Sequence, residues 1–335
     1  MRRHGNLYPQ ITSFGNIVAA YHLARRGKRH MPAVQAFERA PESNLRAIQS
    51  SLTEKTFCTS HYLTRTIYEP KKRTIYILRF APDRIVQHAL MRIVAPIWQK
   101  MFIRDSYACI VGRGIHAGSL RTMEFVRRNK YCLKCDIKSF YQSVNHDILF
   151  SIITRKIKCY DTLWLMENIV YSYPGGQNVP IGNLTSQWFG NLYLNELDHY
   201  VKTTLKIKDY LRYCDDFCFF HNDKSRLNDV AAAVNEFCRD RLRLGLSKCD
   251  LFPVSHGVDF LGYRHFPAGY ILLRKTTAKR VMRRLRALPG QVEDGWLSPE
   301  RARGQVASAW GWMRWANTYH LALHTHIHEL MERYK

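Results

Sequence analysis

The sequence predicts a mixed α/β protein of the α+β class, in which a small antiparallel sheet is combined with many helices. Two short runs rich in aromatic residues, 210–213 and 217–220, flank Asp215–Asp216, which is the pattern of a β-hairpin. A further strand-like run, 131–135, leads into Asp136. Between and after these runs, apolar residues recur at helical spacing.

Charge and composition narrow the class of protein. The chain of 335 residues is 46% hydrophobic, and 51 Lys and Arg against 27 Asp and Glu give a net charge of +24. This balance favours a polyanionic partner, because neutralisation of phosphates dominates nucleic-acid affinity. The sequence has no apolar run of 18 residues and no apolar signal core, so we expect no membrane partner and a cytoplasmic location. Nine cysteines, an odd number, favour reduced thiols.

The N-terminal part of the chain is basic. Residues 1–37 contain six Lys and Arg and no acid, and 11–23 has the apolar spacing of a helix. Its role stays open between an RNA contact and a solvated basic helix. Two strand-like runs, 61–68 and 74–80, follow, and the joining residues 69–73 place three cations at the tip of a predicted hairpin.

Helical patterns occupy much of the remaining chain. From Asp83 to Met101, apolar residues recur at helical spacing. Asn145 is expected to cap a helix, and another helix is expected over 188–201. The C-terminal residues 264–335 hold thirteen Lys and Arg against five Asp and Glu, which indicates a basic helix that lies along a nucleic-acid duplex.

Three carboxylates, Asp136, Asp215 and Asp216, stand at the ends of strand-like runs. Buried adjacent carboxylates repel each other and need cations. Strand ends that bring three carboxylates together suit a pair of divalent ions, which stabilise the attacking and leaving oxygens of a phosphoryl displacement. Magnesium prefers such hard oxygen ligands. A solvated Asp-Asp turn is the alternative, and the aromatic residues around it count against that alternative.

These residues resemble the motifs of reverse transcriptases, in the family's order, over about 68–263. Asp136 matches the first palm motif of that family, and Tyr213-Cys214-Asp215-Asp216 matches its Tyr-x-Asp-Asp motif. The resemblance implies a right-hand polymerase with an antiparallel palm sheet. The implied parts are a basic N-terminal extension (1–54), fingers and palm (55–264) and a helical thumb (265–335).

The resemblance implies an RNA-directed DNA polymerase that binds template RNA, cDNA and dNTPs and uses two magnesium ions, for which manganese could substitute. The implied metal ligands are Asp136, Ile137, Asp215 and Asp216, of which the three acids are catalytic. The implied nucleotide contacts are Lys71, Arg73, Tyr141, Ile181 and Gly182. The implied template and primer contacts are Arg113, Gln187, Leu261, Gly262, Lys279 and Arg283.

Two of these roles follow from the family's pattern around the nucleotide. Lys71 and Arg73 match the Lys and Arg with which the fingers hairpin holds the triphosphate, and Lys72 could take the place of either. Tyr141, five positions after Asp136, matches a bulky ring beneath the sugar. A ring there would clash with a 2′-hydroxyl and so favour deoxynucleotides.

One motif departs from the common family pattern. Ile181-Gly182-x-x-x-Ser186-Gln187 stands where most reverse transcriptases have Gln-Gly-x-x-x-Ser-Pro. The change removes a side chain that can both donate and accept hydrogen bonds near the nucleotide. It resembles the reverse transcriptases of diversity-generating retroelements, which are bacterial, archaeal or phage-encoded.

Those enzymes copy a template RNA with errors opposite adenine, work with a small basic accessory protein, and serve mutagenic retrohoming. Two alternatives stay open. One is a retron, intron-derived or defence-associated reverse transcriptase of ordinary fidelity. The other is a non-catalytic RNA-binding scaffold.

Overall fold

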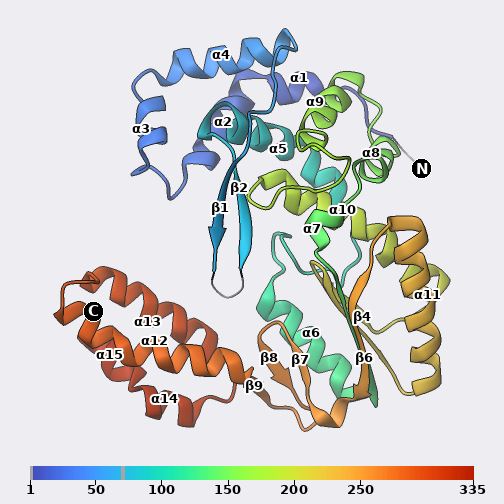
Figure 1. Cartoon of the computed structure of the whole chain (residues 1–335), viewed down its shortest axis with the longest axis vertical. Coiled ribbons are helices and arrows are strands. Elements are labelled where there is room, and N and C mark those ends of the chain that lie inside the picture. Colours follow the sequence, from blue (N-terminus) through green and yellow to red (C-terminus); the bar gives the residue numbers. More distant parts are fainter. Residues whose placement is uncertain (1–2, 69–71) are drawn as a thin grey trace. The chain divides into compact units, whose positions relative to one another are not determined.

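A computed structural model describes residues 3–68 and 72–335, which divide into two compact units (Figure 1). Lys71 lies outside the described residues. The first unit consists of Met1–Arg104, Asp136–Lys206 and Ala232–Lys248. The second consists of Asp105–Cys135, Ile207–Ala231 and Cys249–Lys335. The predicted mixed α/β class with antiparallel strands is confirmed.

Helices form most of the first unit. Its α-helices are α1 (Tyr8–Thr12), α2 (Phe14–Arg25), α3 (Pro32–Phe37), α4 (Pro41–Thr53), α5 (Ile85–Gln99), α7 (Phe140–Ser143), α8 (His146–Thr154), α9 (Tyr160–Val170) and α10 (Leu184–His199). Two π-helical turns are η1 (Phe80–Arg84) and η2 (Tyr200–Thr204). The predicted hairpin is present as β1 (Leu63–Ile67) and β2 (Arg73–Ile77), antiparallel, with Leu63 opposite Ile77.

The single helix expected over 11–23 is instead two helices that meet at Ser13. The Ser13 hydroxyl accepts a hydrogen bond from the Asn16 N–H (3.4 Å), which caps the start of α2. Asn16 is buried, donates to the Ala89 carbonyl of α5 (3.0 Å) and accepts from Arg92 Nε (2.9 Å). The expectation was wrong because the apolar spacing continues across a residue whose side chain begins a new helix.

The helix expected from residue 188 begins earlier, at Leu184. Most of α10 is buried on every side, so its sequence lacks the polar face that marks a helix boundary. The Leu184 N–H donates to Gln87 Oε1 in α5 (3.1 Å), and the Ser186 hydroxyl donates to the Pro180 carbonyl (2.7 Å). A side chain from another helix therefore satisfies an N–H of the first turn, which has no partner within its own helix.

The second unit combines small sheets with a C-terminal group of helices. The elements that lie wholly within it are α6 (Ile115–Arg128), β4 (Tyr210–Tyr213), β5 (Asp216–His221), η3 (Val254–His256), β7 (Val258–Phe260), β8 (Tyr263–His265), β9 (Ile271–Leu273), α12 (Lys275–Glu293), α13 (Pro299–Met313), α14 (Tyr319–Thr325) and α15 (Ile327–Arg333). Three elements contain a boundary between the units, namely β3 (Tyr131–Ile137), α11 (Lys224–Leu242) and β6 (Leu246–Pro253).

The strands form sheets in the orders β4-β5-β3-β6 and β7-β8-β9. Two apolar clusters support the second unit. One contains Phe125, Phe220 and Phe260, and the other lies among the C-terminal helices and contains Leu285 and Met313. Across residues 3–68 and 72–335, every helix is too short or too polar to span a bilayer. The three-part division into 1–54, 55–264 and 265–335 stays a prediction.

Candidate active site

Asp215 and Asp216 lie at the tip of the β4–β5 hairpin. Tyr213 pairs with Asp216, so Cys214 and Asp215 alone make the turn and Asp216 begins β5. Cys214 has a φ of 57°, the left-handed conformation that two-residue hairpin turns require. Both carboxylates are half-buried. Burial raises the pKa of Tyr213, and Cys109 and Cys214 raise it further, so its phenol is neutral beside the acids at pH 7.

Arg212 supports this turn from inside the unit. Its side chain is fully buried, and its Nη1 donates to the Cys214 carbonyl (3.0 Å). Its backbone is joined to the segment before α6, because Arg212 N–H donates to the Asp105 carbonyl and Tyr107 N–H donates to the Arg212 carbonyl (2.9 Å each). A buried guanidinium is costly unless its N–H groups are hydrogen-bonded. Sequence reasoning assigned no role to Arg212, since a bond to a backbone oxygen leaves no motif in the sequence.

Asp136 is positioned within the first unit by Ser247. The Ser247 hydroxyl donates to Asp136 Oδ2 (2.6 Å) and to its backbone carbonyl (3.2 Å). Next to it, the Lys138 N–H donates to the Gly245 carbonyl (2.9 Å). A hydroxyl that donates to a carboxylate fixes the orientation of that oxygen. Sequence reasoning missed Ser247, since it is far from Asp136 in the chain.

Tyr141 packs against α10 at a glycine. A Cβ on Gly190 would lie 3.0 Å from Phe140 Cε1 and 3.2 Å from Tyr141 Cε1, so a side chain there would displace both rings. The Tyr141 carbonyl accepts from the Val179 N–H (2.8 Å). The half-buried Tyr141 is therefore held between α10 and the segment that leads to Ile181.

The Ile181–Gly182 turn is bonded to the β1–β2 hairpin. The Tyr76 N–H of β2 donates to the Ile181 carbonyl (2.9 Å). Gly182 has a φ of 125°, and a Cβ there would lie 2.2 Å from the Tyr76 carbonyl oxygen, which excludes any side chain. Arg73 is the first residue of β2 and is exposed. The structure thus brings Ile181 and Gly182 against the strand that begins with Arg73.

A second tight hairpin carries Leu261 and Gly262, between β7 and β8. Their φ values are 57° and 85°. A Cβ on Gly262 would lie 2.8 Å from Trp312 Cζ3, and a Cβ on Gly118 would lie 2.7 Å from Leu261 Cδ1. The Arg274 N–H donates to the Gly262 carbonyl (3.0 Å). Close packing against α6 and α13 therefore fixes this turn.

The remaining predicted contacts lie on exposed or partly exposed surfaces. Arg113 Nη1 donates to the Ser106 carbonyl (3.0 Å). Lys279 and Arg283 are exposed on α12, whose Leu285 is buried in the C-terminal cluster. Gln187 is exposed on α10, in the first unit. These side chains can therefore contact a ligand in solvent.

Within residues 3–68 and 72–335, no group of three or more His, Cys, Asp or Glu side chains could hold a metal ion. Asp136 belongs to the first unit, whereas Asp215 and Asp216 belong to the second. The chemistry of the donors nevertheless fits magnesium, because carboxylate oxygens are its preferred protein ligands. Ile137 can add only its backbone carbonyl, since its side chain has no ligand atom.

Comparison with known proteins identifies the family. The family described as "Reverse transcriptase (RNA-dependent DNA polymerase)" matches residues 69–265. Protein YkfC of Escherichia coli (strain K12) is 25% identical over 340 residues, which cover 83% of each chain. Retron Ec73 reverse transcriptase of Escherichia coli is 27% identical over 172 residues, which are 48% of this chain and 50% of the relative. Because the family match spans more than half of the chain, the protein belongs to the reverse transcriptase family and is an RNA-directed DNA polymerase.

Proposed function

We propose that this polymerase is the mutagenic reverse transcriptase of a diversity-generating retroelement, which copies template RNA into cDNA with errors opposite adenine. The supporting observation is the Ile181–Gly182 turn. Its backbone is tied to Tyr76, and the residue that most of the family supplies as Gln is here an aliphatic side chain. An aliphatic side chain cannot hydrogen-bond to the nascent base pair. A wrong base pair therefore leaves no polar group of this side chain without a partner, and the energetic cost that would disfavour the wrong pair is absent.

We propose that Asp136, Asp215 and Asp216, with the carbonyl of Ile137, are the ligands of two magnesium ions. Bound there, the ions would stabilise negative charge on the attacking and leaving oxygens. The primer 3′-oxygen forms a bond to the α-phosphorus, and pyrophosphate leaves. The chain's own part is to orient these groups, which accounts for most of the catalysis of phosphoryl transfer. Ser247 orients Asp136 by its hydroxyl, with a bond of 2.6 Å.

The nucleotide side of the site is proposed to consist of residues from the first unit. Arg73, with Lys71, is assigned to the triphosphate, and Tyr141 to the face of the sugar. The contact between Tyr141 and Gly190 limits how far the ring can retreat, so a 2′-hydroxyl would clash. Gly182 brings backbone close to the base pair, because it has no Cβ.

Sequencing of cDNA made from a defined RNA template tests the mutagenic assignment. The wild-type enzyme is expected to misincorporate opposite adenine about tenfold more often than opposite the other bases, which corresponds to about 1.4 kcal/mol of lost discrimination. Ile181→Gln is expected to lower the errors at adenine, and Ile181→Val, which stays aliphatic, is the matched control. A uniform error spectrum in the wild type would overturn the assignment.

A second candidate is an enzyme of ordinary fidelity, of the retron kind. The similarity to Retron Ec73 reverse transcriptase favours it, although that match covers only 48% of this chain. The same cDNA sequencing separates the two candidates, since the second predicts rare errors without a preference for adenine.

We also propose a small basic accessory protein as partner, on the strength of the retroelement assignment alone. The division into an extension (1–54), fingers and palm (55–264) and a thumb (265–335) belongs to the same proposal. Both this protein, at +24, and such a partner are basic, so a shared RNA is the expected bridge between them. Nuclease treatment should therefore separate the two proteins on a sizing column.

A further inference from the structure

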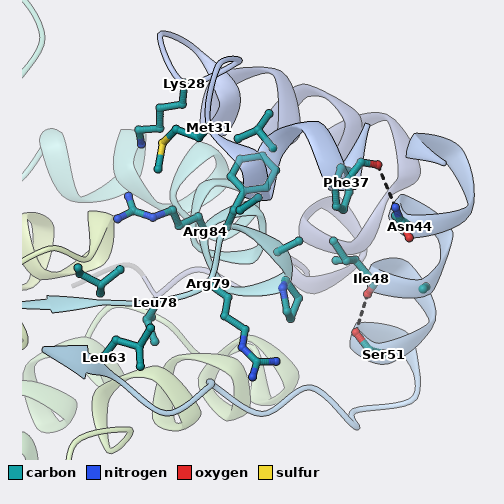
Figure 2. Close-up of a pocket in the computed structure, with 17 residues that line it drawn as sticks. Lys28, Met31, Phe37, Asn44, Ile48, Ser51, Leu63, Leu78, Arg79 and Arg84 are labelled. Carbon is teal, nitrogen blue, oxygen red and sulfur yellow. Dashed lines mark hydrogen bonds between the residues drawn. The ribbon is translucent and has the colours of Figure 1, made fainter. Parts of the chain in front are cut away.

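The first unit contains a cavity of about 770 Å³ that is separate from the residues assigned to catalysis (Figure 2). This volume falls within the range of roughly 300–1,000 Å³ that is typical of small-molecule sites. Its buried wall consists of Val34, Phe37, Ile48, Leu78 and Phe80. α3, α4 and the segment that follows β2 supply these side chains, so the wall is apolar and comes from several elements.

The polar side chains that line the cavity fall into two kinds. Asn44 Nδ2 donates to the Phe37 carbonyl (2.9 Å) and the Ser51 hydroxyl donates to the Ile48 carbonyl (2.8 Å), so both are bonded within the wall (Figure 2). The others are cations. No acidic residue is among the seventeen described residues of the lining.

Three cations line the cavity: Lys28, Arg79 and Arg84. In Figure 2, Lys28 and Arg84 lie on the side of the cavity opposite Phe37 and Ile48. Among residues 3–68 and 72–335, no ion pair joins any of the three to a carboxylate. Burial lowers the pKa of Lys28, and the nearby charge of Arg84 lowers it further.

An apolar wall opposite unpaired cations favours a ligand that has an apolar part and an anionic part. The wall favours a hydrocarbon or aryl body, because burial of apolar surface is favourable in proportion to its area. The cations favour an anionic group, because each repels the other until a negative charge lies between them. A cationic amphiphile would satisfy the wall and add to that repulsion.

We propose that this cavity is a binding site for a small organic anion with an apolar body, of the class of acyl or aryl carboxylates. The apolar body lies against Phe37, Ile48 and Phe80, and the carboxylate accepts hydrogen bonds from Lys28 and Arg84. None of the lining residues is among those assigned to template or nucleotide. Leu63 and Ile77, the paired residues at the open end of the β1–β2 hairpin, also line the cavity.

The charge preference is tested on the full chain with two ligands of equal chain length. Decanoate and decyltrimethylammonium each compete with the fluorescent anion 1-anilinonaphthalene-8-sulfonate. Decanoate is expected to displace this probe with one-to-one stoichiometry, at a concentration at least tenfold below that required of the cation. Equal displacement by the two amphiphiles would overturn the proposal, since apolar burial alone would then explain binding.

The location is tested with matched variants. Ala33 lines the cavity and Ala36, on the same helix, does not, and both are exposed. Ala33→Trp is expected to weaken decanoate binding at least tenfold, and Ala36→Trp to leave it unchanged.

Arg84→Gln is expected to weaken decanoate binding about fivefold, which is the scale of a partly exposed ion pair. Arg29→Gln removes an equal charge outside the lining and is expected to change it less than twofold.

A methyl spectrum keeps the proposal testable if a tryptophan variant does not fold. Met31 lines the cavity and is 43% exposed. Its methyl resonance therefore reports on ligand binding in the wild-type protein, without any substitution. Saturation with decanoate is expected to shift this resonance. An unmoved Met31 resonance, or equal effects of Arg84→Gln and Arg29→Gln, would place the ligand elsewhere on a basic surface and overturn the proposal.

Discussion

The turn at Asp215 and the turn at Gly262 are built alike but held in place by different forces. Each joins two antiparallel strands of the second unit through two residues, with positive φ values of 57° at Cys214 and Leu261. The buried Arg212 guanidinium holds the first turn by its bond to the Cys214 carbonyl. Contact with the Trp312 ring holds the second.

The difference follows from what each turn must expose. Carboxylates that are to bind cations cannot be covered by apolar side chains without losing their hydration, so the support for Asp215 comes from a polar group beneath the backbone. The turn at Gly262 carries no charge and can therefore be held by apolar contact. We infer that hydrogen bonding to the backbone helps to hold the charged turn, whereas the fit of apolar atoms helps to hold the other turn.

The largest effect is expected when Asp215 of the charged turn is replaced, and it is an effect on the rate of primer extension. Asp215→Ala should lower the rate of primer extension by at least about a thousandfold, roughly 4 kcal/mol, because a proposed metal ligand is lost. RNA binding should stay within twofold of the wild type. Asp229→Ala, at an exposed position of α11, is the control and should extend normally. Normal extension by Asp215→Ala would remove the catalytic assignment.

Arg212→Met should have the next largest effect. The variant keeps an apolar stem but loses the donor to the Cys214 carbonyl, so Asp215 is no longer held in one position. We expect kcat to fall about a hundredfold, about 3 kcal/mol, with KM for dNTP little changed. Arg212→Lys, which restores one donor, should recover part of the rate. A folded Arg212→Met with normal kcat would show that the turn does not need this bond.

The apolar hairpin should respond to pH through His265 in β8. Its buried ring contacts Ser119 Oγ (2.7 Å) and the Val258 carbonyl (3.1 Å), and burial lowers its pKa to about 4, an effect that Val258 and Asp259 partly offset. The folded state therefore binds this proton less tightly than the unfolded state, whose pKa is about 6.5. The stabilisation is complete above pH 6.5 and is lost as the pH falls towards 4.

The loss should amount to roughly 3 kcal/mol over this window. Urea unfolding of the wild type and of His265→Gln, compared from pH 7 to pH 4.5, measures it, because the difference between the two proteins removes the contributions of other groups. Parallel pH profiles for the two proteins would contradict the prediction.

The smallest effect is expected from Gly262→Ala. The added Cβ meets both a φ of 85° and the Trp312 ring, which together should cost about 2 kcal/mol of stability and speed the dissociation of a primer–template duplex. Gly304→Ala in α13 is the control, since a Cβ there has open space and should be neutral or slightly stabilising. Equal unfolding free energies for the two variants would show that packing does not fix this turn.

Local chemistry explains which elements could be predicted. Asn145 caps α8 as expected, with its side chain accepting from the Ile148 N–H (3.0 Å), since a cap and its partner are three residues apart. The β1–β2 and β4–β5 hairpins were also predicted, because their signals lie within a few residues of each other. The start of α10 could not be predicted, since Gln87 of α5 satisfies its first turn.

The sequence by itself determined the reverse transcriptase family and the three acids proposed to do its chemistry, because motif residues are recognised one short segment at a time. Only the tertiary structure decided what holds those acids and the nucleotide turn. Ser247 on Asp136, Arg212 beneath Asp215 and Tyr76 on Ile181 are partners that act through hydrogen bonds. Two of these bonds use a backbone carbonyl and the third joins residues far apart in the chain, and neither kind of bond leaves a pattern in the amino-acid sequence.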